Sequence, residues 1–163
     1  MITRITAGAF LACGNKVLMM KRGLHKELAP GMWAGIGGHM DFSEITNPRA
    51  LNLMETCYRE IYEEAGINKA DIFCLKLRYI AVRKDGNEIR AHYHHMGRVE
   101  RELPLPKCEE GELHWVDKKD IAGLPMTTTV KKAVLHWLTN PENDEVYLVA
   151  VNKTNDGAII SEL

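Results

Sequence analysis

The chain has 163 residues, of which 45% are hydrophobic and 26% are charged. This length and composition exclude a disordered protein and suit one domain with a substantial core. The formal net charge is −1, from 21 basic and 22 acidic residues, so no overall positive field favours nucleic acid or an anionic membrane surface.

The first segment of the chain predicts a β-hairpin. Residues 5–13 are apolar and strand-like, Gly14-Asn15 supplies a two-residue turn, and 16–21 is the partner strand. Proline and glycine then punctuate residues 22–41, which we expect to form a loop.

A long helix is expected next. Asn47 is suited to be its N-cap, and Pro48 is suited to the first helical position. The helix should continue to Ala65, where Gly66 provides a C-terminal stop.

The rest of the chain predicts more strands than helices. The expected elements are a long hairpin of 72–82 and 88–99, a proline-rich loop at 103–106, a short strand at 114–116, a helix at 130–138 capped from 127–129, and a final hairpin of 146–151 and 158–160. These elements predict a mixed α+β domain over 1–163, with its core at about 3–140 and an additional C-terminal hairpin at 141–163.

The cysteines and the N-terminal segment bear on the cellular compartment. Cys13, Cys57, Cys74 and Cys108 lie far apart in sequence, so we expect buried free thiols rather than a disulfide framework or a zinc site. The chain starts without the apolar stretch of a signal peptide, and it has no run of 18 apolar residues. A cytoplasmic location without a membrane span is therefore expected.

Three glutamates share one face of the long helix. At about 100° per residue, Glu63 and Glu64 fall within about 60° on either side of Glu60. Like charges at this spacing are unfavourable, as are anions near a helix C-terminus, and a bound divalent cation would reverse both effects. An all-oxygen set of ligands favours Mg²⁺, with Mn²⁺ as the alternative. Taken alone, the pattern also fits a solvated acidic face.

The apolar residues of this helix form a separate stripe, roughly 140° from the acidic face. It comprises Leu51, Met54, Tyr58, Ile61 and Ala65. We expect this stripe to face the core, and we expect no basic side chain within the acidic face.

The sequence around the glutamates resembles the Nudix box, which is Gly, five residues, Glu, seven residues, then Arg-Glu-apolar-x-Glu-Glu-x-Gly-apolar. Gly38, Glu44 and the segment 59–67 match its specified positions, and Gly37 completes a glycine pair. Fourteen residues separate Glu44 from Arg59, where the family has seven. Seven additional helical residues turn by about 700°, close to two full turns, so the acidic face would keep its orientation.

The resemblance implies an α/β/α sandwich with a mixed sheet and a catalytic loop-helix-loop. It also implies Mg²⁺-dependent hydrolysis of a pyrophosphate bond in a nucleoside diphosphate or triphosphate derivative, by attack of water on phosphorus. Clearance of oxidised nucleotides is one such role. The expected partner is a small nucleotide-type substrate rather than nucleic acid or a membrane, and a homodimer is an open alternative.

The resemblance also assigns residue roles. Arg59, Glu60, Glu63 and Glu44 are the expected catalytic residues, with Arg59 orienting Glu60 and Glu44 bracing the loop. The general base is left open. The expected metal ligands are the Gly37 carbonyl, Glu60, Glu63, Glu64 and Glu110, with Glu109 as the alternative to Glu110.

Substrate contacts are less clearly indicated. The candidates are Arg22, His25, Gly38, His39, Tyr93 and His95. A transition-metal site from His92 and His94 is an alternative, because the two residues share a strand face. Trp33 either packs in the core or stacks on a base.

Two other functions are compatible with the resemblance. Some Nudix-like domains bind nucleotides without cleaving them, although their motifs are often broken and this one is intact. Isomerisation of isopentenyl diphosphate on the same fold needs a catalytic cysteine, and neither Cys57 nor Cys108 is obviously placed for that role.

Overall fold

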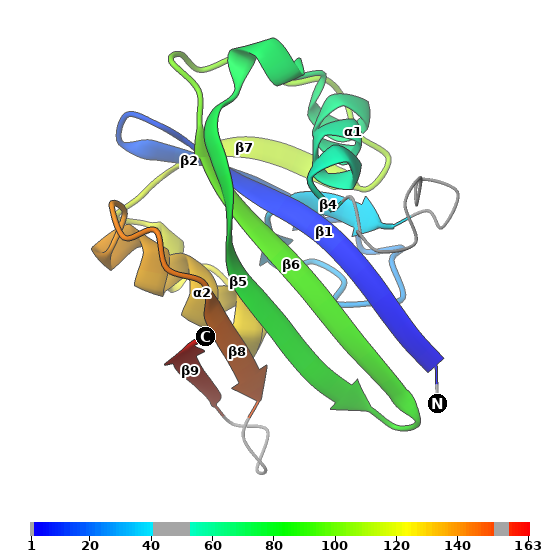
Figure 1. The fold of residues 1–163 in the computed structure, drawn as a ribbon. Coiled ribbons are helices and arrows are strands. Elements are labelled where there is room, and N and C mark those ends of the chain that lie inside the picture. Colours follow the sequence, from blue (N-terminus) through cyan, green and yellow to red (C-terminus); the bar gives the residue numbers. More distant parts are fainter. Residues whose placement is uncertain (1, 41–52, 152–156) are drawn as a thin grey trace.

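The computed structural model describes residues 2–40, 53–151 and 157–163. A mixed β-sheet runs through the molecule, as Figure 1 shows. Its strands follow the order β3 (Trp33–Ala34), β2 (Lys16–Arg22), β1 (Ile2–Cys13), β6 (Glu88–Arg98), β5 (Phe73–Asp85), β8 (Tyr147–Val151) and β9 (Ala158–Glu162). Beside this path, β4 (Ile36–His39) pairs with β1, and β7 (Gly111–Asp117) pairs with β2.

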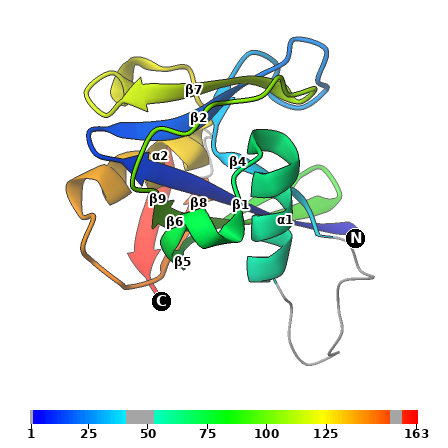
Figure 2. The same ribbon diagram turned by 90° about the horizontal axis from the view of Figure 1, so that it is seen from above.

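The helices α1 (Leu53–Ala65) and α2 (Thr128–Thr139) pack on opposite faces of the sheet. On β1, Ala9 belongs to the core beneath α1, whereas its neighbour Phe10 belongs to the core beneath α2. Successive strand residues point to opposite faces, so one strand contributes to both cores. Figure 2 shows the two helices lying apart. The expected α/β/α sandwich is confirmed. Two short 3₁₀ helices, η2 (Lys69–Asp71) and η3 (Ile121–Gly123), complete the described elements.

The loop predicted for 22–41 is partly wrong, because it contains β3 and β4. One edge of β1 pairs with β2 through Leu11–Cys13 and with β4 through Thr6–Ala9. Strands β2 and β4 therefore pair with different parts of the same edge of β1. Strand β3 has only two residues, and β4 has four, of which two are glycine, so neither carries much apolar alternation. Their extended form is decided by tertiary pairing.

Helix α1 ends where the sequence predicts. Gly66 has φ of 66°, a left-handed value that glycine adopts readily, and its N–H donates to the Tyr62 carbonyl at 2.9 Å. The predicted start at Asn47 and Pro48, and also Glu44, lie outside the described residues.

The predicted hairpins β1–β2, β5–β6 and β8–β9 are all present. The last one extends the sheet, because β8 pairs in parallel with β5. The expectation of buried thiols holds only for Cys57. Cys74 is exposed, and Cys13 and Cys108 are half-buried. Within the described ranges, no helix is long and apolar enough to cross a membrane.

Candidate active site

Strand β4 lies beside α1 and places a glycine pair against its glutamates. The Gly37 N–H donates to Glu64 Oε2 at 3.1 Å. In an extended strand, the N–H and the C=O of one residue point to the same edge. The Gly37 carbonyl therefore also faces the glutamates, as its expected role as a metal ligand requires.

Gly38 leaves room for the second glutamate. A Cβ atom at Gly38 would overlap the carboxyl group of Glu60, whereas a Cβ at Gly37 would overlap the backbone of Ala7 and Gly8 in β1. The two glycines are therefore needed for different reasons. Gly38 accommodates a functional side chain, and Gly37 accommodates the sheet.

We expect Gly38→Ala to lower activity about 10- to 100-fold with little loss of stability, because the flexible Glu60 side chain yields to the new methyl group. Gly37→Ala should instead lower the free energy of unfolding by about 1–3 kcal/mol, since the obstacle is backbone. Kinetics and thermal melting of both variants check this contrast. Gly123→Ala is the control, because nothing lies within 4 Å of a Cβ placed there. Equal loss of stability in Gly37→Ala and Gly38→Ala would contradict the assignment.

Arg59 organises the acidic face of α1. Its guanidinium donates to Glu60 Oε1 at 2.9 Å, to Glu63 Oε2 at 3.0 Å and to the His39 carbonyl at 3.2 Å. The expectation that no basic side chain lies within the acidic face is therefore wrong, because the long Arg59 side chain reaches across it.

The acidic face is also less separate from the core than the helical wheel predicts. The side chain of Glu63 is 55% exposed, but residue Glu64 is only 8% exposed. Strand β4 causes the difference, because it covers the side of α1 where Glu64 lies. One glutamate therefore faces solvent, and another is enclosed.

Burial and mutual repulsion disfavour the ionised state of these glutamates. Burial and then the charge of Glu60 raise the pKa of Glu64 to about 8, and Glu110 adds a smaller contribution, against the opposing effects of the Gly37 hydrogen bond and of Arg22. Burial likewise raises the pKa of Glu60, although Arg59 opposes the rise. Such carboxylates lack sufficient positive charge nearby, which is the condition that a bound divalent cation would relieve.

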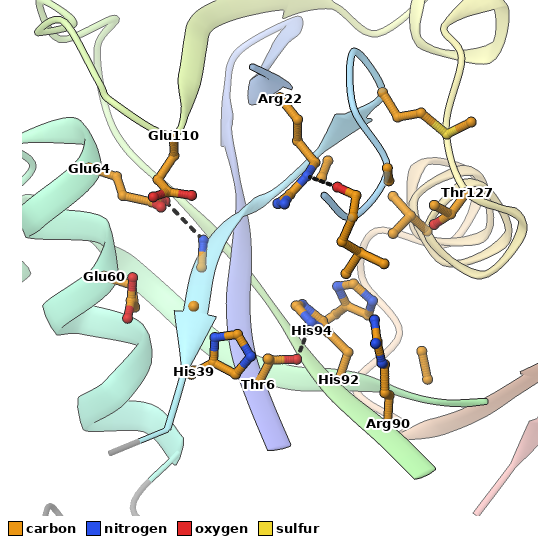
Figure 3. A pocket seen from close by; sticks show the side chains of 18 of the residues that line it. Thr6, Arg22, His39, Glu60, Glu64, Arg90, His92, His94, Glu110 and Thr127 are labelled. Carbon is orange, nitrogen blue, oxygen red and sulfur yellow. Dashed lines mark hydrogen bonds between the residues drawn. The ribbon is translucent and has the colours of Figure 1, made fainter. Parts of the chain in front are cut away.

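Glu110 joins this group from the turn before β7. Its charge raises the pKa values of both Glu60 and Glu64, and it forms an ion pair with Lys26 at 2.5 Å. Figure 3 shows Glu110 directed toward Glu64. In the described part of the chain, no three His, Cys, Asp or Glu side chains already stand close enough to form a complete metal site. The oxygen donors nevertheless fit Mg²⁺ or Mn²⁺.

A cavity of about 1590 Å³ extends from these carboxylates across the sheet. Arg22 lines it near the carboxylates, and its Nε donates to the Leu28 carbonyl at 2.9 Å. Gly38 and His39 also line the cavity, as does half-buried Trp33. Three of the predicted substrate contacts therefore line the same cavity, namely Arg22, Gly38 and His39.

The other three predicted substrate contacts do not line this cavity. His25 is exposed in the loop after β2. Tyr93 and His95 alternate with His92 and His94 on β6, and His92 and His94 are the pair that lines the cavity. His95 is buried on the opposite face, where its Nδ1 lies 3.3 Å from the Gly8 carbonyl.

The histidine pair is uncharged near neutral pH. Burial lowers the pKa of His92 to about 4, and burial with the His92 charge lowers the pKa of His94 well below its usual value. His92 Nδ1 lies 2.5 Å from the Thr6 hydroxyl, whereas His94 Nε2 is buried without a partner in the structure. Strand alternation reveals that the histidines fall into two pairs, but only the fold decides which pair faces the cavity.

Sequence reasoning missed Arg4, Arg83 and Arg90, which line the same cavity. They come from β1, β5 and β6 and are scattered along the chain. No local motif connects them. Strand register alone brings them together.

The comparison with protein families identifies one family, and its match includes every described residue of the candidate site. The sequence profile of the NUDIX domain matches residues 2–138. Among curated proteins, none matches the sequence.

Solved structures with the same fold are distant in sequence. A MutT protein from Bacillus halodurans superposes with a TM-score of 0.67 at 20% identity, covering 97% of each chain. A NUDIX hydrolase from Nitrosomonas europaea gives 0.70 at 16% identity, covering 94% of this chain and 81% of that one. The NUDIX domain of Shewanella oneidensis NrtR, complexed with ADP ribose, gives 0.59 at 16% identity and covers 86% and 88%. At such identities the likeness shows the fold alone.

Proposed function

The chain belongs to the Nudix family of hydrolases, and from that premise we propose that it is a Mg²⁺-dependent hydrolase of a nucleoside diphosphate or triphosphate derivative. The observation that carries the proposal is the convergence of Glu60, Glu64 and Glu110 at one end of a large cavity. Burial and repulsion raise the pKa values of two of these carboxyls, so the site favours a cation. The cavity beside them has room for a nucleotide.

Glu60, Glu64 and Glu110 would hold the ion together with the Gly37 carbonyl, and Mn²⁺ is the alternative to Mg²⁺. We expect small rotations of the three side chains to complete the coordination. When bound, the ion supplies charge neutralisation at the pyrophosphate and lowers the pKa of the attacking water. Glu63 stays a candidate ligand, although its carboxylate pairs with Arg59.

Other residues would orient the reacting groups. Arg59 holds the Glu60 carboxylate by a charge-assisted hydrogen bond. Arg22 is placed to contact phosphate oxygens, because it lines the cavity and its charge acts on both Glu64 and His92. Glu44 stays the proposed brace of the catalytic loop. The base that accepts the proton from water stays open among the glutamates.

Clearance of oxidised nucleotides is one candidate role within this proposal. We also propose a cytoplasmic location, which the free thiols support.

A hydrolysis screen tests the proposal directly, with release of phosphate or pyrophosphate as the readout for triphosphates and newly formed phosphatase-sensitive phosphate monoesters as the readout for the other anhydrides. The panel comprises dNTPs, oxidised dNTPs, ADP-ribose, dinucleoside polyphosphates and nucleotide sugars. We expect turnover of at least one anhydride in Mg²⁺ and none in excess chelator. Tight calorimetric binding without turnover in saturating Mg²⁺ would instead show a nucleotide-binding module. Absence of both would contradict the proposal.

A further inference from the structure

Three arginines form a row across neighbouring strands at one end of the cavity. Strand register places Arg4 of β1 opposite Arg90 of β6, and Arg90 opposite Arg83 of β5. Residues paired in this way point to the same face of a sheet. All three side chains line the cavity that contains the carboxylates.

Such a row is costly for the sheet itself. Like charges directly opposite one another on adjacent strands are destabilising. Glu88 offsets part of this cost, because it forms ion pairs with Arg4 and, at 2.7 Å, with Arg90. The hydrogen bond from Arg90 accordingly lowers the pKa of Glu88. An arrangement that concentrates guanidinium groups on a cavity wall is typical of anion recognition.

The row is distant from the carboxylates. On β1, the position of the carboxylates is marked by Gly8, because Gly8 lies opposite Gly37 and the Gly37 N–H donates to Glu64. At about 3.3 Å for each strand residue, the four residues from Arg4 to Gly8 span about 13 Å. In Figure 3, Glu60 and Glu64 lie on one side of β1 and Arg90 lies on the other. One phosphate group cannot contact both ends.

The β1 and β6 residues between the two ends are polar but uncharged, and Arg22 reaches the same stretch of the cavity from β2. His92 and Thr6 face each other on adjacent strands, two residues along from the arginine row. His94 follows, with its unpartnered Nε2. Neutral imidazoles suit hydroxyl groups and ring nitrogens rather than phosphate. Acidic side chains therefore gather at one end of the cavity and the arginine row lies at the other, with Arg22 and the neutral imidazoles between them.

We propose that Arg4, Arg83 and Arg90 form a subsite for a second phosphate group of the substrate, remote from the pyrophosphate that is cleaved. The inference rests on the proposed function for the orientation of the substrate. The substrate class is then a nucleotide that carries a phosphate monoester in addition to its anhydride. Two guanidinium groups can each donate paired hydrogen bonds to such a group.

Calorimetry in Mg²⁺ with AMP, adenosine 2′,5′-bisphosphate and adenosine 3′,5′-bisphosphate tests the subsite. These probes contain no anhydride, so binding is measured whether or not the protein hydrolyses anything. We expect at least one bisphosphate to bind about 10- to 100-fold more tightly than AMP, as charge-assisted hydrogen bonds predict. Equal affinity for AMP and both bisphosphates would overturn the subsite, even if the hydrolase screen succeeds.

Substitutions of the three arginines test whether they cause the preference for a bisphosphate over AMP. Arg83→Gln and Arg90→Gln should each reduce the preference at least about tenfold, and Arg90→Lys should restore part of it. Arg4→Gln provides an independent test, because its side chain is 54% exposed and its replacement puts folding at little risk. Lys84→Gln is the matched control. It removes a charge from the same hairpin, but Lys84 is exposed and does not line the cavity. A preference that survives all three glutamine variants would overturn the inference.

Discussion

Glu64→Gln and Glu60→Gln are each expected to lower kcat at least about 100-fold toward the best substrate of the screen, because each removes a proposed oxygen ligand of the metal. Both variants should fold, since glutamine has nearly the same shape and can still accept the Gly37 hydrogen bond in place of Glu64. The apparent affinity for Mg²⁺ should also fall. Steady-state kinetics over a range of Mg²⁺ concentrations measures both effects.

Glu55→Gln is the matched control for these variants. Glu55 lies on the same helix, and it forms an exposed ion pair with Lys69 at 2.8 Å. Its replacement removes the same charge without touching the cavity, so kcat should change less than about twofold. If Glu60→Gln or Glu64→Gln kept full activity, the assigned mechanism would be wrong.

The metal-free protein should lose stability as pH rises through the pKa of Glu64. In the folded state this pKa is about 8, above the ordinary value of 4.5. A raised pKa favours the protonated folded state, so its stabilising contribution is complete below pH 4.5 and is lost as pH rises through about 8. At about 1.4 kcal/mol for each tenfold change in proton affinity, the loss is at most about 5 kcal/mol.

Denaturant unfolding of wild type and Glu64→Gln in chelator measures this loss. The variant should gain stability relative to wild type between pH 5 and pH 9, because its neutral amide does not ionise. Excess Mg²⁺ should restore much of the wild-type stability at high pH by binding the ionised folded state. A stability difference that is constant over this range would contradict the burial of an unneutralised Glu64.

The histidines of β6 oppose this trend at low pH. The pKa of His92 is lowered to about 4, so its contribution is complete above its ordinary value of 6.5 and is lost as pH falls through 4. Comparison of wild type with Glu64→Gln therefore isolates the glutamate from the histidines. Both proteins share the His92 and His94 contributions.

Local sequence was sufficient for the acidic helix over Leu53–Ala65 and for the hairpins. The spacing of Arg59, Glu60, Glu63 and Glu64 is a property of helical periodicity, and Gly66 stops the helix through its own backbone preference. The hairpins β1–β2 and β5–β6 join neighbouring segments through short turns at Gly14 and Gly86, both with positive φ. Each of these features depends on residues close together in the chain.

Tertiary structure decided what surrounds that helix. Strand β4 is extended because it pairs with β1, and this pairing encloses Glu64 while Glu63 stays exposed. Sequence alternation separates His92 and His94 from Tyr93 and His95, but the position of α1 and α2 determines which pair faces the cavity.

The arginine row depends most strongly on tertiary structure. Arg4, Arg83 and Arg90 become neighbours only through the register of three strands, two of which pair in parallel across more than 80 residues of chain. By itself, therefore, the sequence determined the acidic helix and the family to which the chain belongs. The fold decided how burial changes the acidity of that helix and which charges face it across the cavity, because burial and non-local strand register arise only when distant segments pack together.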